Sequence, residues 1–199
     1  APEHVPIERY LDDKNMSLDF ILITHHHSDH IDGINHLKLK YSPKVIGAKR
    51  DRHRLPQLDI EVEEGKQLTI GSKTFDIYDV DGHTVGHIAY SLLEDKALFS
   101  GDSLMVMGCG RLFEGSPEDM WKSLEKLKQL PEDFMIYSGH EYTKSNIEFA
   151  MTVDPQNKKL ISRRTKELEH LQKGLPTVPS TLREELDTNP FLRESELSI

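Results

Sequence analysis

Two apolar runs in the first part of the chain have the pattern of strands that are buried on both faces. Residues 18–24 read Leu-Asp-Phe-Ile-Leu-Ile-Thr, and residues 44–48 form the second run. Nearly continuous apolar runs of this length are typical of strands inside a sheet. The apolar positions in residues 5–13 and 31–41 have helical spacing instead, so we expect a helix in each of these two segments.

Shorter β runs follow, separated by turns that contain glycine. They cover residues 67–71, 73–80, 88–93 and 97–100, and a last buried strand is predicted at 134–138. Ser116 followed by Pro117 has the pattern of a helix N-cap with proline at the first helical position, which predicts a helix to about residue 130. The mixture of strands and helices predicts an α/β fold.

The pattern changes after residue 140. From Lys144 onward the spacing is helical only, with a long helix predicted at 156–173 and a rigid, proline-containing connector at 176–180. We therefore predict an α/β domain over residues 1–140 and a small helical domain over residues 141–199. The basic side chains of the long helix and of an earlier loop are expected to be solvated; they are Lys158, Lys159, Arg163, Arg164 and Lys166, and Lys49, Arg50, Arg52 and Arg54.

The composition is that of a globular protein, with 36% hydrophobic and 30% charged residues among 199. No apolar run approaches the ~20 residues of a membrane-spanning helix, and the net charge of −9 argues against a binder of nucleic acid. Cys109 alone cannot form an internal disulfide, so the fold does not depend on an oxidising compartment. We expect Cys109 to be a small residue in a tight turn. We also expect a monomer in the cytoplasm, with the mitochondrion as the alternative compartment.

The strongest feature is residues 24–30, which read Thr-His-His-His-Ser-Asp-His directly after a buried strand. Residues two apart on an extended chain point to the same side, so His25 and His27 can reach one metal ion together. Asp29 and His30, around the bend, can face a second ion. Imidazoles and carboxylates suit zinc, iron and manganese alike.

Three further candidates follow predicted strands in the same way. His83, Asp102 and His140 each come directly after a strand and a glycine, which lets the backbone turn sharply at the sheet edge. Ligands from separate strand ends can meet at one point, so we predict one metal-binding cluster. The other histidines are expected outside it: His26 faces away, His87 has a supporting role, and the rest are ordinary surface or core residues, namely His4, His36, His53 and His170.

The histidine-rich segment is similar to the T-H-x-H-x-D-H signature of the metallo-β-lactamase superfamily. Residues 82–84 (Gly-His-Thr), 100–102 (Ser-Gly-Asp) and 139–140 (Gly-His) match the later metal motifs of that superfamily in order. The resemblance implies an αββα sandwich with the metal ions on one edge.

Other segments resemble glyoxalase II, the hydroxyacylglutathione hydrolase family. They are residues 108–115 (Gly-Cys-Gly-Arg-Leu-Phe-Glu-Gly), residues 139–143, and residues 176–181 together with 189–193. The resemblance covers nearly the whole chain, including the helical tail that most of the superfamily lacks. It implies that a hydroxide held by two metal ions hydrolyses S-lactoylglutathione to glutathione and lactate, a 2-hydroxy acid, with residues 141–199 as a substrate-binding domain.

The resemblance also implies roles for single residues. The first metal would be held by His25, His27 and His83, the second by Asp29, His30 and His140, and both would be bridged by Asp102. The ions would be zinc, with iron or manganese as alternatives, and the catalytic residue Asp29 would orient the hydroxide. The glutathione thioester, a small-molecule partner, would be bound by Arg111, Phe113, His140 and Tyr142. At residues 111 and 113 the family often has Lys and Tyr.

Two departures from the family pattern concern the ends of the chain. The opening strands of the sandwich are expected to be absent before Ala1, and the chain stops at Ile199, short of the basic C-terminal segment with which the family holds the carboxylates of glutathione. A protein that lacks both parts would have an incomplete sheet and weakened substrate binding.

Three alternative functions remain at this point. A persulfide dioxygenase of the same superfamily would hold a single iron ion and consume oxygen. A metal-dependent lactonase or nuclease would use the same cluster on another substrate, although the acidic composition weighs against a nuclease. A metal-binding scaffold without catalytic activity would stay inert after reconstitution with zinc, iron or manganese.

Overall fold

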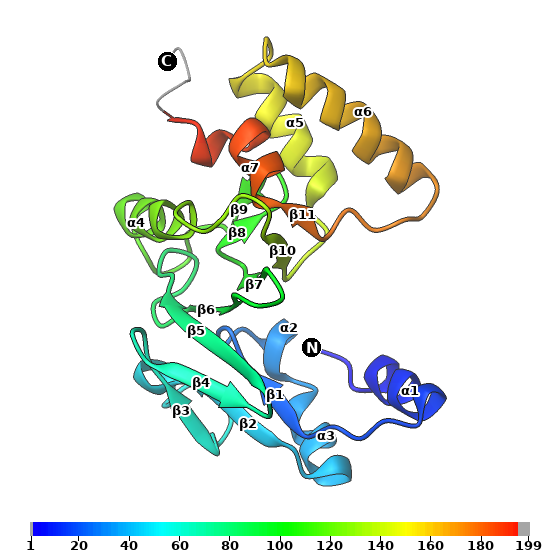
Figure 1. Cartoon of the computed structure of the whole chain (residues 1–199), viewed down its shortest axis with the longest axis vertical. Coiled ribbons are helices and arrows are strands. Elements are labelled where there is room, and N and C mark those ends of the chain that lie inside the picture. Colours follow the sequence, from blue (N-terminus) through cyan, green and yellow to red (C-terminus); the bar gives the residue numbers. More distant parts are fainter. Residues whose placement is uncertain (1, 195–199) are drawn as a thin grey trace.

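The computed structural model describes residues 2–194, so Ala1 and residues 195–199 of the predicted helical domain lie outside the described residues. Two β-sheets form the centre of the molecule, and helices cover their outer faces (Figure 1). The smaller sheet has the strand order β1-β2-β3, and its strands are parallel. It consists of β1 (Phe20–Leu22), β2 (Lys44–Ala48) and β3 (Ile60–Val62).

The larger sheet has six strands in the order β11-β10-β7-β6-β5-β4. Neighbours from β4 to β7 are antiparallel, β10 is parallel to β7, and β11 is antiparallel to β10. The strands are β4 (Gln67–Ile70), β5 (Lys73–Asp79), β6 (Ile88–Leu92), β7 (Ala97–Gly101), β10 (Met135–Ser138) and β11 (Ser180–Thr181). The strands that the sequence predicts are all present in these two sheets, and β3 and β11 are two further strands that it did not predict.

Apolar side chains fill the space between the two sheets. Ile46 of the smaller sheet packs with Ile77 and Ile88 of the larger sheet, and all three are buried. The hydroxyl group of Tyr90, also buried there, donates a hydrogen bond to the carbonyl oxygen of Ile23 at 2.8 Å. Because a buried hydroxyl without a partner costs free energy, this bond stabilises the position of β6 against the chain that follows β1.

One helix covers the outer face of each sheet. The longer helices of this part are α1 (Val5–Lys14), α3 (Ile34–Tyr41) and α4 (Pro117–Leu127), and the two that cover the sheets are α3 and α4. Ile34 of α3 packs on Val45, which points away from Ile46 because consecutive residues of a strand face opposite sides. Leu124 and Leu127 of α4 pack in the same way on the larger sheet. The order helix, sheet, sheet, helix confirms the αββα sandwich.

A group of helices lies at one end of the molecule, beyond the larger sheet (Figure 1). It comprises α5 (Thr143–Val153), α6 (Lys158–Gln172), α7 (Leu182–Thr188) and the short 3-10 helix η2 (Pro190–Leu192). Ile147, Ala150 and Leu160 pack on Val106 and Met107 of the α/β part. Part of the helical region is thus built on the core of the sandwich.

The structure corrects the predicted helix at 31–41. Ile31 ends a separate short helix, α2 (Ser28–Ile31), and α3 begins only after Asp32 and Gly33. Apolar spacing continues across this break, which is why the sequence pattern did not reveal it. The predicted N-cap at Ser116 is confirmed, since its hydroxyl group accepts a hydrogen bond from the amide of Asp119.

The predicted turn around Cys109 and the predicted connector at 176–180 also need correction. Residues 108–109 form β9 (Gly108–Cys109), which pairs with β8 (Leu104–Met105), so the turn lies at residues 106–107, where Met107 has φ 52°. The connector runs into β11, which adds a strand to the larger sheet. A two-residue strand such as β11 is too short to produce a periodic pattern, whereas β3 lies in the alternating segment 58–63 (Leu-Asp-Ile-Glu-Val-Glu), which the sequence analysis did not select.

Arg163 is buried rather than solvated. Its guanidinium donates hydrogen bonds to Glu185 at 2.7 Å and to Thr188 at 2.6 Å. The carboxylate of Glu185 is fully buried and also accepts from the hydroxyl group of Ser180 and from the backbone amide of Met107. This buried network joins α6, α7 and β11 to the β8–β9 hairpin, and the burial of Arg163 is compensated by its ion pair.

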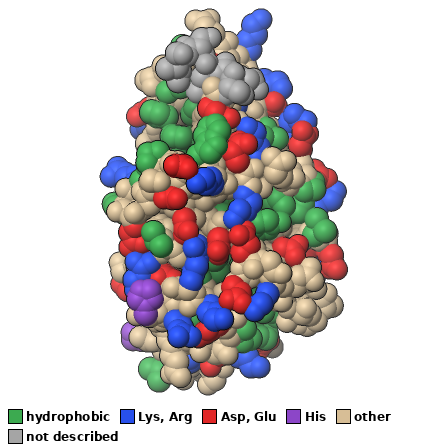
Figure 2. Space-filling model, turned by 90° about the vertical axis from the view of Figure 1, so that its left-hand side faces the viewer, with side chains coloured by type: hydrophobic (Ala, Val, Ile, Leu, Met, Phe, Trp, Pro, Cys, Tyr) green, Lys and Arg blue, Asp and Glu red, His purple; other side chains and the backbone are tan. Residues whose placement is uncertain are grey.

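On the face shown in Figure 2, basic and acidic side chains lie interspersed, mainly over its middle and lower left. Among the described residues, no helix combines the length and the hydropathy required to cross a bilayer.

The buried network of Glu185 yields a stability prediction. Glu185→Ala removes the carboxylate nearest to the buried Arg163 and leaves it with Glu167, 3.7 Å from its Nε, so we expect the free energy of unfolding to fall by about 3–5 kcal/mol. Urea unfolding followed by circular dichroism measures this change. The control Glu169→Ala, at an exposed position of α6, should change it by less than about 0.5 kcal/mol. Equal stability of the two variants would contradict the prediction.

Candidate metal centre

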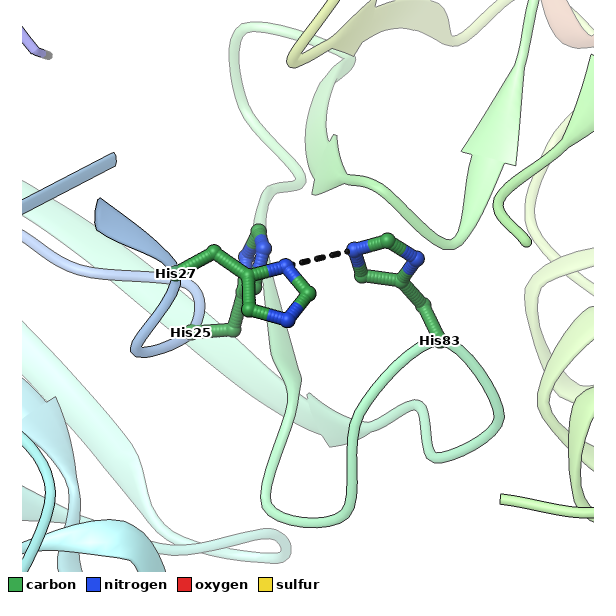
Figure 3. A group of neighbouring side chains, drawn as sticks. All are labelled: His25, His27 and His83. Atoms are coloured by element: carbon green, nitrogen blue, oxygen red, sulfur yellow. Dashed lines mark hydrogen bonds between the residues drawn. The ribbon is translucent and has the colours of Figure 1, made fainter. Parts of the chain in front are cut away.

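The loops that follow several strands gather at one edge of the sandwich. His25 and His27 follow β1, and His83 lies in the loop between β5 and β6. Figure 3 shows their rings turned toward one another from these two separate loops. Each of the three offers a ligand atom, all within 4.8 Å of one another, and Nε2 of His83 is 3.0 Å from Nδ1 of His27. We call these three residues the first group.

A second group lies beside the first. Asp29 and His30 belong to α2, which begins directly after His27, and His140 follows β10. These three also offer ligand atoms within 4.8 Å of one another. Nε2 of His140 is 3.1 Å from Oδ2 of Asp29 and 3.2 Å from Nε2 of His30.

Asp102, which follows β7, lies between the two groups. Its Oδ2 is 3.4 Å from Nε2 of His83 and 3.2 Å from Nε2 of His140. Its Oδ1 is 3.3 Å from Nε2 of His30. The carboxylate is therefore in contact with side chains of both groups, and all seven residues that the sequence selected come together at this edge.

In His83 and in His25, a hydrogen bond holds one ring nitrogen, and the other ring nitrogen faces the cluster. Nδ1 of His83 donates to the carbonyl oxygen of Arg111 at 2.8 Å, so Nε2 of the neutral ring carries a lone pair. Nδ1 of His25 is 3.1 Å from the hydroxyl group of Thr24, and its buried Nε2 has no hydrogen-bond partner among the described residues. A buried nitrogen of this kind fits a metal ligand, because a bound cation would satisfy it.

The protonation states suit metal binding. Burial lowers the pKa of His25, of His27 and of His83, and neighbouring histidines contribute to each shift. Burial alone would raise the pKa of Asp102, but its hydrogen bond with His30 and the nearby histidines outweigh burial and lower it. Neutral imidazoles and an ionised carboxylate are the forms that bind metal ions.

His87 supports the cluster from inside the protein, as the sequence predicts. It is fully buried, its ring stacks on that of His25 with the centroids 4.6 Å apart, and its Nε2 accepts a hydrogen bond from the backbone amide of Asp102 at 3.0 Å. Burial lowers the pKa of His87 to about 3, so it is neutral and able to accept this bond. His87 therefore fixes the backbone from which the Asp102 carboxylate extends.

A set of polar side chains behind the histidine loop was missed by the sequence analysis. Asp51, which is fully buried, accepts hydrogen bonds from Nδ1 of His26 at 3.0 Å and from Nε of Arg54 at 2.6 Å. Arg54 also binds Glu114 at 2.6 Å, so the prediction that Arg54 is solvated is wrong. His26 points away from the cluster as predicted. The one signal in the sequence was an acidic residue within a basic run at 49–54.

The cluster opens onto a pocket with a volume of about 860 Å³. Five of the seven clustered residues contribute to its wall, namely His27, Asp29, His83, Asp102 and His140. Phe149 and Phe191 also line it, with their rings stacked and the centroids 5.5 Å apart. The sequence analysis did not select Phe149, because in a helix its spacing is that of an ordinary apolar position.

The three remaining substrate-binding candidates line the same pocket and are exposed. The ring of Phe113 meets the rings of His27 and His83 edge to face, with centroids 5.5 and 5.3 Å apart. The ring of Tyr142 stacks on that of His140 at 4.7 Å. Arg111 is the only lysine or arginine among the described residues that line the pocket, so it gives the pocket its permanent positive charge.

The other histidines lie outside the cluster. His4 and His36 stack on each other at 4.2 Å, His170 lies 3.7 Å from a carboxylate oxygen of Glu167, and His53 is exposed.

Comparisons with known proteins identify the class to which this fold and cluster belong. Residues 2–140 match the family model described as "Metallo-beta-lactamase superfamily". The crystal structure of the BLEG-1 B3 metallo-beta-lactamase is similar, with a TM-score of 0.70 and 24% identity over 94% of this chain and 83% of that one. The chain is thus a metallo-β-lactamase-fold protein whose His and Asp side chains are placed to bind metal.

The helical region narrows the class further. Residues 141–199 match the model described as "Hydroxyacylglutathione hydrolase C-terminus". Two proteins named hydroxyacylglutathione hydrolase, from Ruegeria pomeroyi and Jannaschia sp., are each 52% identical to this chain. The alignments cover 100% and 97% of this chain and 78% and 75% of those proteins, respectively. The chain belongs to the hydroxyacylglutathione hydrolase family.

Gly139 keeps space open beside the cluster, and this yields a prediction. A Cβ atom at Gly139 would lie 2.3 Å from Oδ1 of Asp102 and 2.7 Å from Cε1 of His30. Gly139→Ala should displace both side chains and lower metal affinity by about 10–100-fold, the usual effect of disturbing ligand orientation. Metal analysis after dialysis measures the loss, and circular dichroism checks the fold. A folded variant with the metal content of the wild type would show that the cluster tolerates the extra atom.

Proposed function

We propose that the chain hydrolyses S-lactoylglutathione to glutathione and lactate with the help of two metal ions. The observation that carries this proposal is the carboxylate of Asp102, which contacts both His/Asp groups at the wall of an open pocket. The similarity of the whole chain to proteins named hydroxyacylglutathione hydrolase supports the choice of a glutathione thioester as the substrate.

The donor atoms fit two divalent ions. The first group would hold one ion and the second group the other, with Asp102 bridging them. Two ligand atoms on a tetrahedral zinc ion, each at about 2.0–2.1 Å, lie roughly 3.3–3.4 Å apart. Six of the observed separations lie at 3.0–3.4 Å, close to that value, and Nε2 of His30 is 3.8 Å from Oδ2 of Asp29. We therefore propose zinc, with iron and manganese as alternatives that accept the same donors.

When bound, the two ions supply a water molecule of lowered pKa as the nucleophile and polarise the thioester carbonyl. Asp29 has 47% of its side chain exposed and lines the pocket, so its carboxylate can accept a hydrogen bond from that water and orient it. Arg111 binds a carboxylate of the glutathione moiety, and the rings of Phe113 and Tyr142 flank the substrate. These residues need not supply a strong acid, because a thiolate leaves readily.

We also propose that residues 1–140 act as a catalytic domain and residues 141–199 as a substrate-binding domain. The first part supplies all seven proposed metal ligands and Arg111, whereas the second supplies Tyr142 and Phe149 to the pocket. His140 stands at the boundary, so the two parts meet at the second metal group.

The structure bears on the alternatives as well. A persulfide dioxygenase would need one iron ion, whereas two groups joined by Asp102 favour two ions. A lactonase or nuclease would share the cluster, but it leaves the full-length similarity to hydroxyacylglutathione hydrolases unexplained. A scaffold without activity does not account for an open pocket at the cluster.

The proposed reaction is tested with the purified chain reconstituted with zinc. We expect hydrolysis of S-lactoylglutathione, two ions per chain, and loss of turnover when a chelator removes them. Asp102→Ala should lower metal content and turnover together, the turnover by at least about 100-fold, because it removes the bridging carboxylate. An Asp102→Ala protein that keeps two ions and full turnover would refute the bridging role. Wild type that leaves the thioester intact after loading with zinc, with iron and with manganese in turn would refute the proposed function.

Arg111 offers a test of substrate binding that leaves the cluster unchanged. Arg111→Leu removes the pocket's permanent positive charge, so we expect KM for the glutathione thioester to rise about tenfold with little change in kcat. The matched control is Lys144→Leu, which removes an exposed charge from α5 and should leave KM unchanged. Steady-state kinetics distinguish the two. An equal KM for both variants would show that Arg111 does not bind the substrate.

A further inference from the structure

A carboxylate next to the second metal group binds a distant segment of the helical region. Oε1 of Glu141 accepts hydrogen bonds from the backbone amides of Val178 at 3.0 Å and Thr177 at 3.1 Å. Oε2 accepts from the hydroxyl group of Thr177, which is also hydrogen-bonded to the hydroxyl group of Thr143. Both carboxylate oxygens of Glu141 are thus occupied by the segment that leads from α6 to β11.

The segment that Glu141 binds is itself firmly held. Thr177 is buried, and a few residues later β11 pairs with β10, with Ser180 opposite Ile136. The hydroxyl group of Ser180 donates to the buried carboxylate of Glu185 at 2.6 Å. Glu141 therefore fastens the loop after β10 to a part of the molecule that is anchored in the larger sheet and in the buried network.

The same loop carries a residue on each side of Glu141 that faces the pocket. His140 belongs to the second metal group, with its Nε2 3.1 Å from Asp29 and 3.2 Å from Asp102. Tyr142 stacks on His140 with an angle of 3° between the rings. Because metal ligands and substrate contacts tolerate only small displacements, a shift of this loop would affect metal binding and substrate binding together.

We propose that Glu141 is a positioning residue that lets the helical region control the second metal group. Its hydrogen bonds to Thr177 and Val178 hold His140 at the distance that the ion requires, and they hold Tyr142 over the pocket. The donors are two backbone amides and the hydroxyl group of Thr177, and a carboxylate is a strong acceptor for all three. This inference rests on the proposed two-metal hydrolase.

Glu141→Ala tests the proposal in the full chain loaded with zinc. Metal analysis after dialysis against a mild chelator should find two ions in the wild type and one in the variant, because the affinity of the second group falls by about 10–100-fold. KM for the thioester should also rise, since Tyr142 moves with the loop. The conservative variant Glu141→Gln keeps one acceptor oxygen and should restore part of both losses.

The matched control is Glu148→Ala, which removes an exposed glutamate from α5 and should retain two ions and the wild-type KM. Thr177→Val provides a milder variant, because it removes the hydroxyl group and leaves the backbone donors in place. It should weaken the second ion selectively, and less than Glu141→Ala does. If Glu141→Ala does not fold, Thr177→Val alone tests whether the Glu141 contact controls the second metal group.

Two results would overturn the inference. One is that Thr177→Val keeps two ions and the KM of the wild type, and that Glu141→Ala does the same if it folds. The other is that a folded variant loses both ions equally, which would indicate a general effect on the cluster. The metal count needs no substrate, so a wild type that binds two ions without hydrolysing the thioester would refute the proposed function alone.

Discussion

The structure depends on the convergence of five imidazoles and two carboxylates at one edge of a β-sandwich. At separations of 3.0–3.4 Å these side chains cannot all be hydrogen-bonded to one another, because most of their facing atoms are acceptors with lone pairs. Burial lowers the pKa of the imidazoles of the first group and favours their neutral form, and cations would stabilise the resulting set of acceptors. Such a cluster can persist only on a scaffold that fixes each backbone segment independently of the metal.

The scaffold does this with contacts that lie behind the cluster. His87 binds the amide of Asp102 and stacks on His25, while Asp51 holds the histidine loop through His26. The pairing of β10 with β7 shifts register just before Gly139, which redirects the chain toward the site. The cluster thus combines residues that face the pocket with buried residues that determine where those side chains point.

The helical region is part of the same construction. Its strand β11 extends the larger sheet, Leu182 enters the core under α4, and Glu185 binds the amide of Met107. These contacts place the Phe149 side chain at the pocket and bring Thr177 within reach of Glu141. The proposed substrate contacts and the candidate metal ligands therefore depend on the same packed elements, although the residues are far apart in the sequence.

The sequence alone predicted an α/β fold and selected the seven clustered residues, because apolar runs and glycines at strand ends are local features. The αββα order was implied by the resemblance of the histidine-rich segment to the metallo-β-lactamase superfamily. It could not reveal β11, the burial of Arg163 or the binding of Asp51 to His26. Each of these depends on a partner more than 20 residues away, and a charged residue looks the same in sequence whether it is solvated or paired. Only tertiary packing brings such partners together, and burial then makes their pairing obligatory.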